Sequence, residues 1–211
     1  MLRLHFHPMS PYSRKAWVAL LHRGDAFEPV QLKLGTGALQ RPEFLAISPF
    51  GKMPVLETGD AEAIIESTSI VEWLESRGPR VLIPDDREAA FAARHFDRIG
   101  DLYLMAPMAT LWWEPRSDGA KETASVAATA WQLFERRLEH RPFVAGAAFT
   151  LGDLGAAIAT DYLERLGVTP PEAIAAWKTR CFEVPAMSRA LAESLPFIEP
   201  ALTRRAASLT S

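Results

Sequence analysis

The first third of the chain alternates apolar and polar side chains over short stretches, whereas the remainder repeats apolar side chains at helical spacing. Residues 2–7 alternate strictly, which predicts a β-strand. Ser10 and Pro11 predict a helix start, because serine is a preferred N-cap and proline suits the first helical position. We expect this helix to end at Gly24, since glycine commonly follows the last helical residue.

The pattern after this helix predicts more strands and two short helices. Residues 27–34 favour a second strand, residues 43–46 a single helical turn, and residues 54–57 with 61–65 a hairpin. A helix capped by Ser67 follows. Because a helix joins the first two strands, they should be parallel, with the hairpin added antiparallel. The predicted order is therefore β-α-β-α-β-β-α.

Residues 78–87 are bounded by prolines and end in polar side chains, which is typical of a linker. The chain beyond them repeats apolar side chains at helical spacing. We expect a first long helix with a core stripe and a kink at Pro107; the stripe comprises Phe91, His95, Ile99, Leu102, Ala106 and Ala109. Further helices are expected over residues 124–138, 150–166, 171–178 and 183–194. The predicted domains are residues 1–77 and an all-helical domain over residues 88–211.

Composition narrows the possible functions. The chain has 211 residues, a net charge of −3 and one cysteine, Cys181, so we expect neither an intrachain disulfide nor a cysteine-based zinc site. This charge does not suggest a nucleic-acid partner. The longest nearly apolar run, residues 102–113, is shorter than the about 20 residues that a membrane span needs, and the N-terminus lacks the pattern of a signal peptide. We therefore expect a cytoplasmic protein without a membrane partner.

Ser10 stands where a strand ends and a helix begins. Its hydroxyl would lie among unpaired backbone N–H groups at the positive end of the helix dipole, which favours negative charge. A thiol brought there would have its pKa lowered from about 8.5. The alternative is that Ser10 only caps the helix, and Ser13 offers a second hydroxyl one turn further on.

Two other short motifs suit a peptide-like ligand. Pro54 begins a predicted strand and can be cis, which would offer the Met53 N–H and C=O groups to a ligand; an ordinary trans strand start is the alternative. Glu66 and Ser67 stand before a predicted helix, where they could hold the ammonium and carboxylate groups of an α-amino acid. Plain helix capping explains that pair equally well.

Thr150 and Asp153 have the spacing of a capping box, with aspartate in place of the usual glutamate. Phe149 and Leu154 occupy the positions of a hydrophobic staple. We interpret this motif as structural, because it starts a helix reliably despite Gly152.

These motifs, in this order, resemble the glutathione S-transferase superfamily over essentially the whole chain. The resemblance implies an α+β thioredoxin-like domain followed by an all-helical domain, and usually a homodimer. The Ser-Pro-Tyr-Ser-Arg-Lys stretch is similar to serine-type classes such as tau and zeta, in which its first serine donates a hydrogen bond to the glutathione thiolate. This implies that Ser10 is catalytic, with Ser13 as the alternative. Cysteine-type classes carry cysteine there, so thiol–disulfide exchange is not expected.

The resemblance also implies the glutathione contacts. Pro54 would be the family's cis-proline, and the Met53 backbone would pair with the cysteinyl residue, although the family often has valine or isoleucine at that position. Glu66 and Ser67 match the acid–serine pair for the γ-glutamyl group. The remaining implied contacts lie near the glycyl carboxylate: Lys52, Gln40 and Arg41. Thr150 and Asp153 match the family's capping box.

The resemblance implies a glutathione transferase that conjugates the glutathione thiolate to small apolar electrophiles. Glutathione is then a co-substrate, and neither a metal nor a tightly bound cofactor is implied. His5 and His7 share a strand face, but without a nearby carboxylate we interpret them as surface residues. Candidate residues for the electrophile pocket are Tyr12, Tyr103, Met108, Trp112 and Trp113; the four beyond Tyr12 could equally be core or dimer-interface residues. The rival functions are a glutathione-dependent isomerase of the maleylacetoacetate type and a non-catalytic binding protein.

Overall fold

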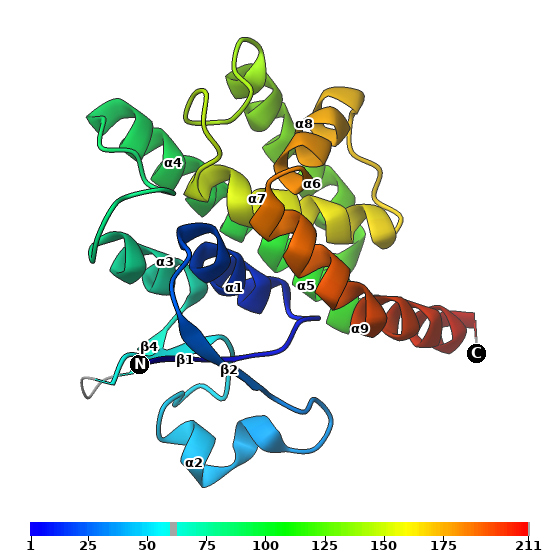
Figure 1. Ribbon diagram of the computed structural model, residues 1–211. Coiled ribbons are helices and arrows are strands. Elements are labelled where there is room, and N and C mark those ends of the chain that lie inside the picture. The colour runs from blue at the N-terminus through cyan, green and yellow to red at the C-terminus, as the bar shows by residue number, and fades with distance from the viewer. Residues whose placement is uncertain (60–62, 211) are drawn as a thin grey trace. The chain divides into compact units, whose positions relative to one another are not determined.

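The computed structural model describes residues 1–59 and 63–210, which divide into two compact units (Figure 1). The first unit comprises Met1–Pro79 together with Arg189–Ala201. The second comprises Arg80–Ser188 together with the chain from Leu202 onward. The first unit thus includes a short segment, Arg189–Ala201, that lies more than a hundred positions after Pro79 in the sequence. No local pattern in the sequence indicates this.

The first unit holds a four-stranded sheet with the strand order β2-β1-β3-β4. The strands are β1 (Leu2–Phe6), β2 (Phe27–Gln31), β3 (Val55–Glu57) and β4 (Ala63–Ile65). β1 pairs in parallel with β2 and antiparallel with β3, which pairs antiparallel with β4, as predicted. β2 accommodates Pro29 because it is an edge strand, where one missing donor costs little. Residues 61 and 62 of the predicted hairpin lie outside the described residues.

Three α-helices and one 3₁₀ turn accompany the four strands within Met1–Pro79. They are α1 (Pro11–Arg23), the 3₁₀ turn Ala38–Gln40, α2 (Pro42–Leu45) and α3 (Ser67–Glu75). Helices α1 and α3 lie on one face of the sheet and α2 on the other (Figure 1). α1 ends at Gly24, whose φ of 73° is the left-handed conformation expected of a glycine cap. The prediction that Ser67 caps α3 is wrong by one residue, because Glu66 is the N-cap and Ser67 the first helical residue.

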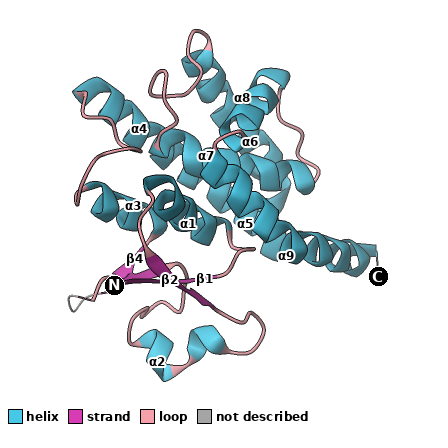
Figure 2. Cartoon of the chain, viewed as in Figure 1, coloured by secondary structure: helices cyan, strands magenta, loops and turns pink. Residues whose placement is uncertain are grey.

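The second unit is helical, as Figure 2 shows. Its elements are α4 (Arg87–Gly100), a π-helical turn (Asp101–Met105), α5 (Ala106–Trp113), α6 (Asp118–Leu138), α7 (Leu151–Arg165) and α8 (Glu172–Phe182). The predicted irregularity near Pro107 takes the form of the π turn, in which the Ala106 N–H reaches the carbonyl of Asp101.

Helix α9 (Pro185–Thr210) is longer than predicted. The sequence predicts a helix over residues 183–194 only, and prolines disfavour helix interiors. The helix instead continues through Pro196 and Pro200. Its middle part belongs to the first unit and both its ends to the second, so tertiary packing supports the helix where its local sequence does not.

The core face of α4 differs from the prediction. Phe91, His95 and Leu102 are exposed, with the rings of Phe91 and His95 stacked 5.6 Å apart. The buried face instead carries small residues such as Ala93, and it packs closely against α7. Small side chains let two helix backbones approach. Of the predicted stripe within α4, Ile99 is buried as expected, whereas Phe91 and His95 are exposed.

Gly152 in α7 makes this close approach possible. A Cβ at this position would lie 2.8 Å from the Ala93 carbonyl oxygen and 2.7 Å from Cγ2 of Val144. We expect Gly152→Ala to lower the thermal midpoint by about 5 °C, because overpacking of about 1–3 kcal/mol outweighs the better helix propensity of alanine. Circular dichroism melting measures this shift.

Gly119→Ala is the matched control for this prediction. Gly119 lies in the first turn of α6, and its nearest neighbour would be a methyl group of Thr110 at 3.3 Å. A side-chain methyl can move where a backbone carbonyl cannot, so this variant should melt at or slightly above the wild-type temperature. Equal melting of Gly152→Ala and Gly119→Ala would contradict the close-approach argument.

Candidate functional site

Three loop segments of the first unit meet at one edge of its sheet. His5 of β1 pairs with Val55 of β3, and Val55 pairs in turn with Ile65 of β4. The end of β1, the start of β3 and the end of β4 therefore lie side by side at this edge. The segments that continue from these strand ends carry Ser10, the Met53–Pro54 pair and the Glu66–Ser67 pair. Pairing of the strands thus brings together three motifs that are up to 57 positions apart in the sequence.

Ser10 is the N-cap of α1 and is partly exposed. Its Oγ accepts a hydrogen bond from the Ser13 backbone N–H at 3.2 Å. A hydroxyl that accepts in this way still has its own hydrogen to donate. Capping and donation to a ligand, which looked like competing interpretations, are therefore compatible at Ser10.

Ser13 has a different environment. Its side chain is fully buried, and its Oγ lies 3.5 Å from the backbone nitrogen of His7. A ligand at the surface of α1 could reach Ser10 without rearrangement of the fold, whereas Ser13 is covered. This difference in burial favours Ser10 over Ser13 as the donor.

The segment before β3 is an ordered turn. The Met53–Pro54 peptide bond is cis, and Pro54 is buried. The Ser48 hydroxyl donates to the Lys52 carbonyl at 2.6 Å and accepts from the Lys52 N–H at 3.1 Å, so it holds the turn from inside. The Lys52 side chain is exposed beyond it. Gln40 and Arg41 are also exposed, at the end of the 3₁₀ turn before α2.

Glu66 has φ of 70°, the one non-glycine residue at positive φ among the described residues. Such backbone conformations are costly and cluster at functional sites. Glu66 is exposed, whereas Ser67 is buried at the N-terminus of α3. Behind them, the fully buried Lys15 donates from Nζ to Thr68 Oγ1 at 2.7 Å, which ties α1 to α3. Local patterns in the sequence did not predict this hydrogen bond between Lys15 and Thr68, although a lysine among the apolar residues of α1 could have indicated a buried contact.

The aromatic residues proposed for an electrophile pocket belong to different elements and differ in exposure. Tyr12 is partly exposed in α1, whereas Tyr103, at 49% exposure, lies in the π turn. Trp113 is exposed, and Trp112 is half-buried with its ring 6.0 Å from that of Tyr162. Met108 is buried in the second unit, so its side chain is part of that core.

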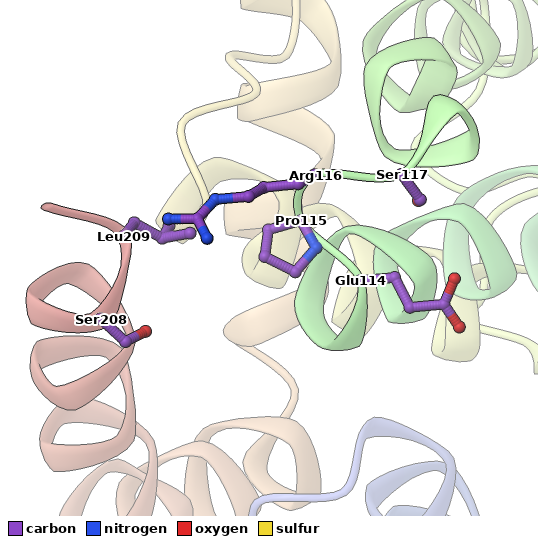
Figure 3. A pocket seen from close by; sticks show the side chains of 6 residues that line it. All are labelled: Glu114, Pro115, Arg116, Ser117, Ser208 and Leu209. Carbon is purple, nitrogen blue, oxygen red and sulfur yellow. The ribbon is translucent and has the colours of Figure 1, made fainter. Parts of the chain in front are cut away.

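A hollow of about 280 Å³ lies elsewhere in the second unit, between the α5–α6 connection and the end of α9 (Figure 3). Its lining comprises Glu114, Pro115, Arg116, Ser117, Ser208 and Leu209. The Arg116 side chain extends toward Leu209 and that of Glu114 turns away from it (Figure 3). None of the predicted site residues lines this hollow.

The capping box predicted at Thr150 and Asp153 is present. Oδ2 of Asp153 accepts from the N–H of Thr150 at 3.0 Å and from its hydroxyl at 2.9 Å. Oδ1 accepts from the Val144 N–H and from the Trp177 indole N–H, both at 3.0 Å. Burial raises the pKa of the Asp153 carboxyl, whereas these four hydrogen bonds act in the opposite direction. Asp153 thus joins three segments of the second unit through one side chain: the loop at Val144, the start of α7 and helix α8.

His5 of β1 and His7, which follows β1, are buried and not at the surface as predicted. His5 is 8% exposed, bonds to the Glu57 carboxylate and lies 6.2 Å from the ring of Phe44. His7 is 7% exposed. The prediction for His5 was wrong because Phe44 of α2 packs against it, and the prediction for His7 was wrong because its ring packs against Phe197 of α9; local alternation reveals neither contact. Over residues 1–59 and 63–210, no group of three or more His, Cys, Asp or Glu side chains could hold a metal ion.

Comparison with known proteins identifies the family. Residues 4–81 match the glutathione S-transferase N-terminal domain, and residues 101–185 match the C-terminal domain. Glutathione S-transferase F10 of Arabidopsis thaliana is 31% identical over 171 residues, which are 75% of this chain and 79% of the relative. A glutathione S-transferase of Pseudomonas putida is 30% identical over 79% of this chain and 77% of its own. The chain therefore belongs to the glutathione S-transferase family, which is a family of enzymes.

Solved structures agree on the fold. The crystal structure of Gtt2 from Saccharomyces cerevisiae has a TM-score of 0.80 at 23% identity and covers 89% of this chain and 99% of its own. Glutathione transferase F7 of Populus trichocarpa has the same TM-score at 22% identity, with 92% and 99% covered. In the described part of the chain, no helix has the length and apolar character required to cross a bilayer.

Proposed function

We propose that this protein conjugates glutathione to small apolar electrophiles, with Ser10 as the donor of a hydrogen bond to the glutathione thiolate. The observation that carries the proposal is the Ser10 hydroxyl at the N-terminus of α1. It is partly exposed, and its capping bond leaves its hydrogen available. The α1 dipole adds to this stabilisation of negative charge on sulfur.

Glutathione would bind along the sheet edge where the three motifs meet. The Met53 backbone lies next to the end of β1, where it can pair with the cysteinyl residue of glutathione. Glu66 and Ser67 follow β4 at the same edge and would receive the γ-glutamyl ammonium and carboxylate. The exposed cations Lys52 and Arg41, with Gln40, would receive the glycyl carboxylate.

The chemistry that follows is nucleophilic substitution or addition. The thiolate sulfur forms a bond to the electrophilic carbon; with an aryl halide, the halide ion leaves with the electron pair of the broken bond. Stabilising the thiolate and holding both reactants together account for the catalysis. Tyr12, Tyr103, Trp112 and Trp113 remain our proposal for contacts with the electrophile, whereas Met108 is buried in the second unit.

We also propose a homodimer, with a second copy as the partner of the apolar residues that the single chain leaves exposed. In the second unit, Phe91 and Leu102 are 64% and 43% exposed. In the first unit, Phe50 is 73% exposed. Single exposed apolar side chains are common on protein surfaces, so the main support for the proposal is the family resemblance, which implies a homodimer. Sedimentation velocity checks the proposal, and a monomer at micromolar concentration would contradict it.

The direct test of the proposed function is turnover of an aryl halide with glutathione, together with retention on a glutathione resin. Conjugation and retention are the expected results. Retention without turnover of any electrophile would favour a binding protein, and isomerisation of an acidic enone without conjugation would favour the isomerase. Absence of both binding and turnover would refute the proposal.

Glu66→Gln should weaken glutathione binding more than it slows the chemical step. The carboxylate is placed at the ammonium group, far from sulfur, so it contacts ground and transition states alike. Such uniform binding is seen in KM rather than in kcat. Steady-state kinetics should show KM for glutathione raised by about tenfold, as for a lost bond to a charged group, with kcat nearly unchanged. A fall in kcat at constant KM would remove Glu66 from this position.

A further inference from the structure

His7 is a buried ionisable side chain for which the proposed chemistry has no role. It follows β1 directly and precedes the turn that leads to Ser10 and α1. Its ring packs in a T-shaped arrangement against Phe197 of α9, with the ring centres 5.1 Å apart and the planes at 77°. Phe197 belongs to the stretch Arg189–Ala201, which is part of the same compact unit.

His7 also organises the turn by hydrogen bonds. Its Nδ1 accepts the N–H of Met9 at 3.1 Å, and its carbonyl oxygen accepts the N–H of Ser10 at 2.9 Å. Its own backbone nitrogen lies 3.5 Å from the Ser13 hydroxyl. His7 thus contacts Met9 and Ser10 at the end of the turn, and also Ser13 in the first turn of α1.

Because Nδ1 accepts a hydrogen bond, the protonation state and tautomer of the His7 imidazole can be assigned. An imidazole nitrogen accepts a hydrogen bond only when it carries no proton, so the hydrogen of the neutral ring is assigned to Nε2. Burial lowers the pKa of His7, which favours this neutral form at physiological pH. An apolar ring could fill the same space beside Phe197, but it would leave the Met9 N–H without this acceptor.

We propose that His7 is a positioning residue for glutathione activation: its neutral imidazole holds the Met9 N–H, and thereby keeps the turn in the conformation that presents the Ser10 hydroxyl. The inference rests on the proposed role of Ser10. It assigns to His7 no contact with the reacting atoms and no proton transfer. Because His7 acts through Ser10, its removal cannot cost more activation than removal of the Ser10 hydroxyl itself.

The test compares two substitutions of His7. His7→Phe keeps a ring against Phe197 but has no acceptor, whereas His7→Asn places an amide oxygen near the position of Nδ1. The readout is the ultraviolet absorbance of the thiolate of bound glutathione, followed against pH. His7→Phe should reduce the ionisation constant of the bound thiol by about tenfold, the magnitude expected for one lost hydrogen bond, and His7→Asn should restore most of it.

A double-mutant cycle then separates positioning from general packing. In the Ser10→Ala background, His7→Phe should change the ionisation constant less than twofold, because the hydroxyl that it positions is absent. Three results would overturn the inference: His7→Phe titrating like the wild type, His7→Asn being as impaired as His7→Phe, or a full additional loss in the Ser10→Ala background.

Thiolate measurements on the wild-type protein distinguish failure of this inference from failure of the proposed function. If the wild type binds no glutathione thiolate, the proposed function fails and the inference fails with it. If the wild type binds the thiolate and His7→Phe matches it, only the inference fails. Should His7→Phe not fold, nitrogen NMR of the wild-type imidazole decides: an unprotonated Nδ1 at neutral pH supports the inference, and a protonated Nδ1 overturns it.

Discussion

Asp153→Ala should lower the thermal midpoint by about 10 °C, the largest stability loss that we expect from one substitution. The side chain is fully buried and accepts from two backbone N–H groups, one indole N–H and one hydroxyl. Each buried donor left without an acceptor costs about 1–3 kcal/mol, so three or four such donors together exceed the loss of an ordinary cap. Differential scanning calorimetry measures the shift.

Asp86→Ala is the control that isolates this network. Asp86 caps α4 through one bond to the Ala89 N–H at 2.8 Å and is exposed. Its removal should cost about 0.5–2 kcal/mol, or a few degrees. Activity per folded molecule of Asp153→Ala should stay near that of the wild type, since no glutathione contact is assigned to it. Equal losses in the two variants would show that Asp153 acts as a cap alone.

Ser10→Ala should reduce conjugation of an aryl halide by about tenfold to a hundredfold at neutral pH. A hydrogen bond to a charged group contributes about 1.5–3 kcal/mol, which converts to a factor of this size. The thiolate absorbance of bound glutathione should appear at higher pH than in the wild type. Because Ser10 also caps α1, the variant should lose about 0.5–2 kcal/mol of stability, which a melting curve records separately.

Ser13→Ala is the matched control for Ser10→Ala. Both substitutions remove one hydroxyl from the start of α1, but only that of Ser13 is fully buried. Ser13→Ala should therefore leave the titration of bound glutathione unchanged. An unchanged rate in Ser10→Ala together with a collapsed rate in Ser13→Ala would transfer the donor role to Ser13.

Local signals in the sequence were enough to predict the order of strands and α-helices over Met1–Pro79, the N-terminal part of the first unit. Ser10 with Pro11 begins α1 and Gly24 ends it, because capping depends only on residues within one helical turn. The capping box at Thr150 was predictable for the same reason. The assignment of the site to the sheet edge, in contrast, required the resemblance to a known family, since each motif alone also fitted a structural role.

Contacts between residues far apart in the sequence determined which side chains are buried, which the local patterns did not predict. The packing of α2 on the sheet buried His5, which local alternation had placed at the surface, and no pattern linked His7 to Phe197. Neither contact could be inferred locally, since the partners of His5 and His7 lie 39 and 190 positions further along the chain.

Capping and periodicity in the sequence thus located most helices and strands and supplied the side chains with suitable chemistry, although the cap of α3 is Glu66 rather than Ser67 and α6 begins at Asp118 rather than at residue 124. Three features became visible in the folded chain alone: Gly152 lies against the α4 backbone, α9 continues through Pro196, and Ser13 is covered while Ser10 is accessible. The difference lies in how far along the chain each interaction acts. Capping and periodicity act between residues a few positions apart, whereas burial and backbone approach depend on segments that meet only after folding.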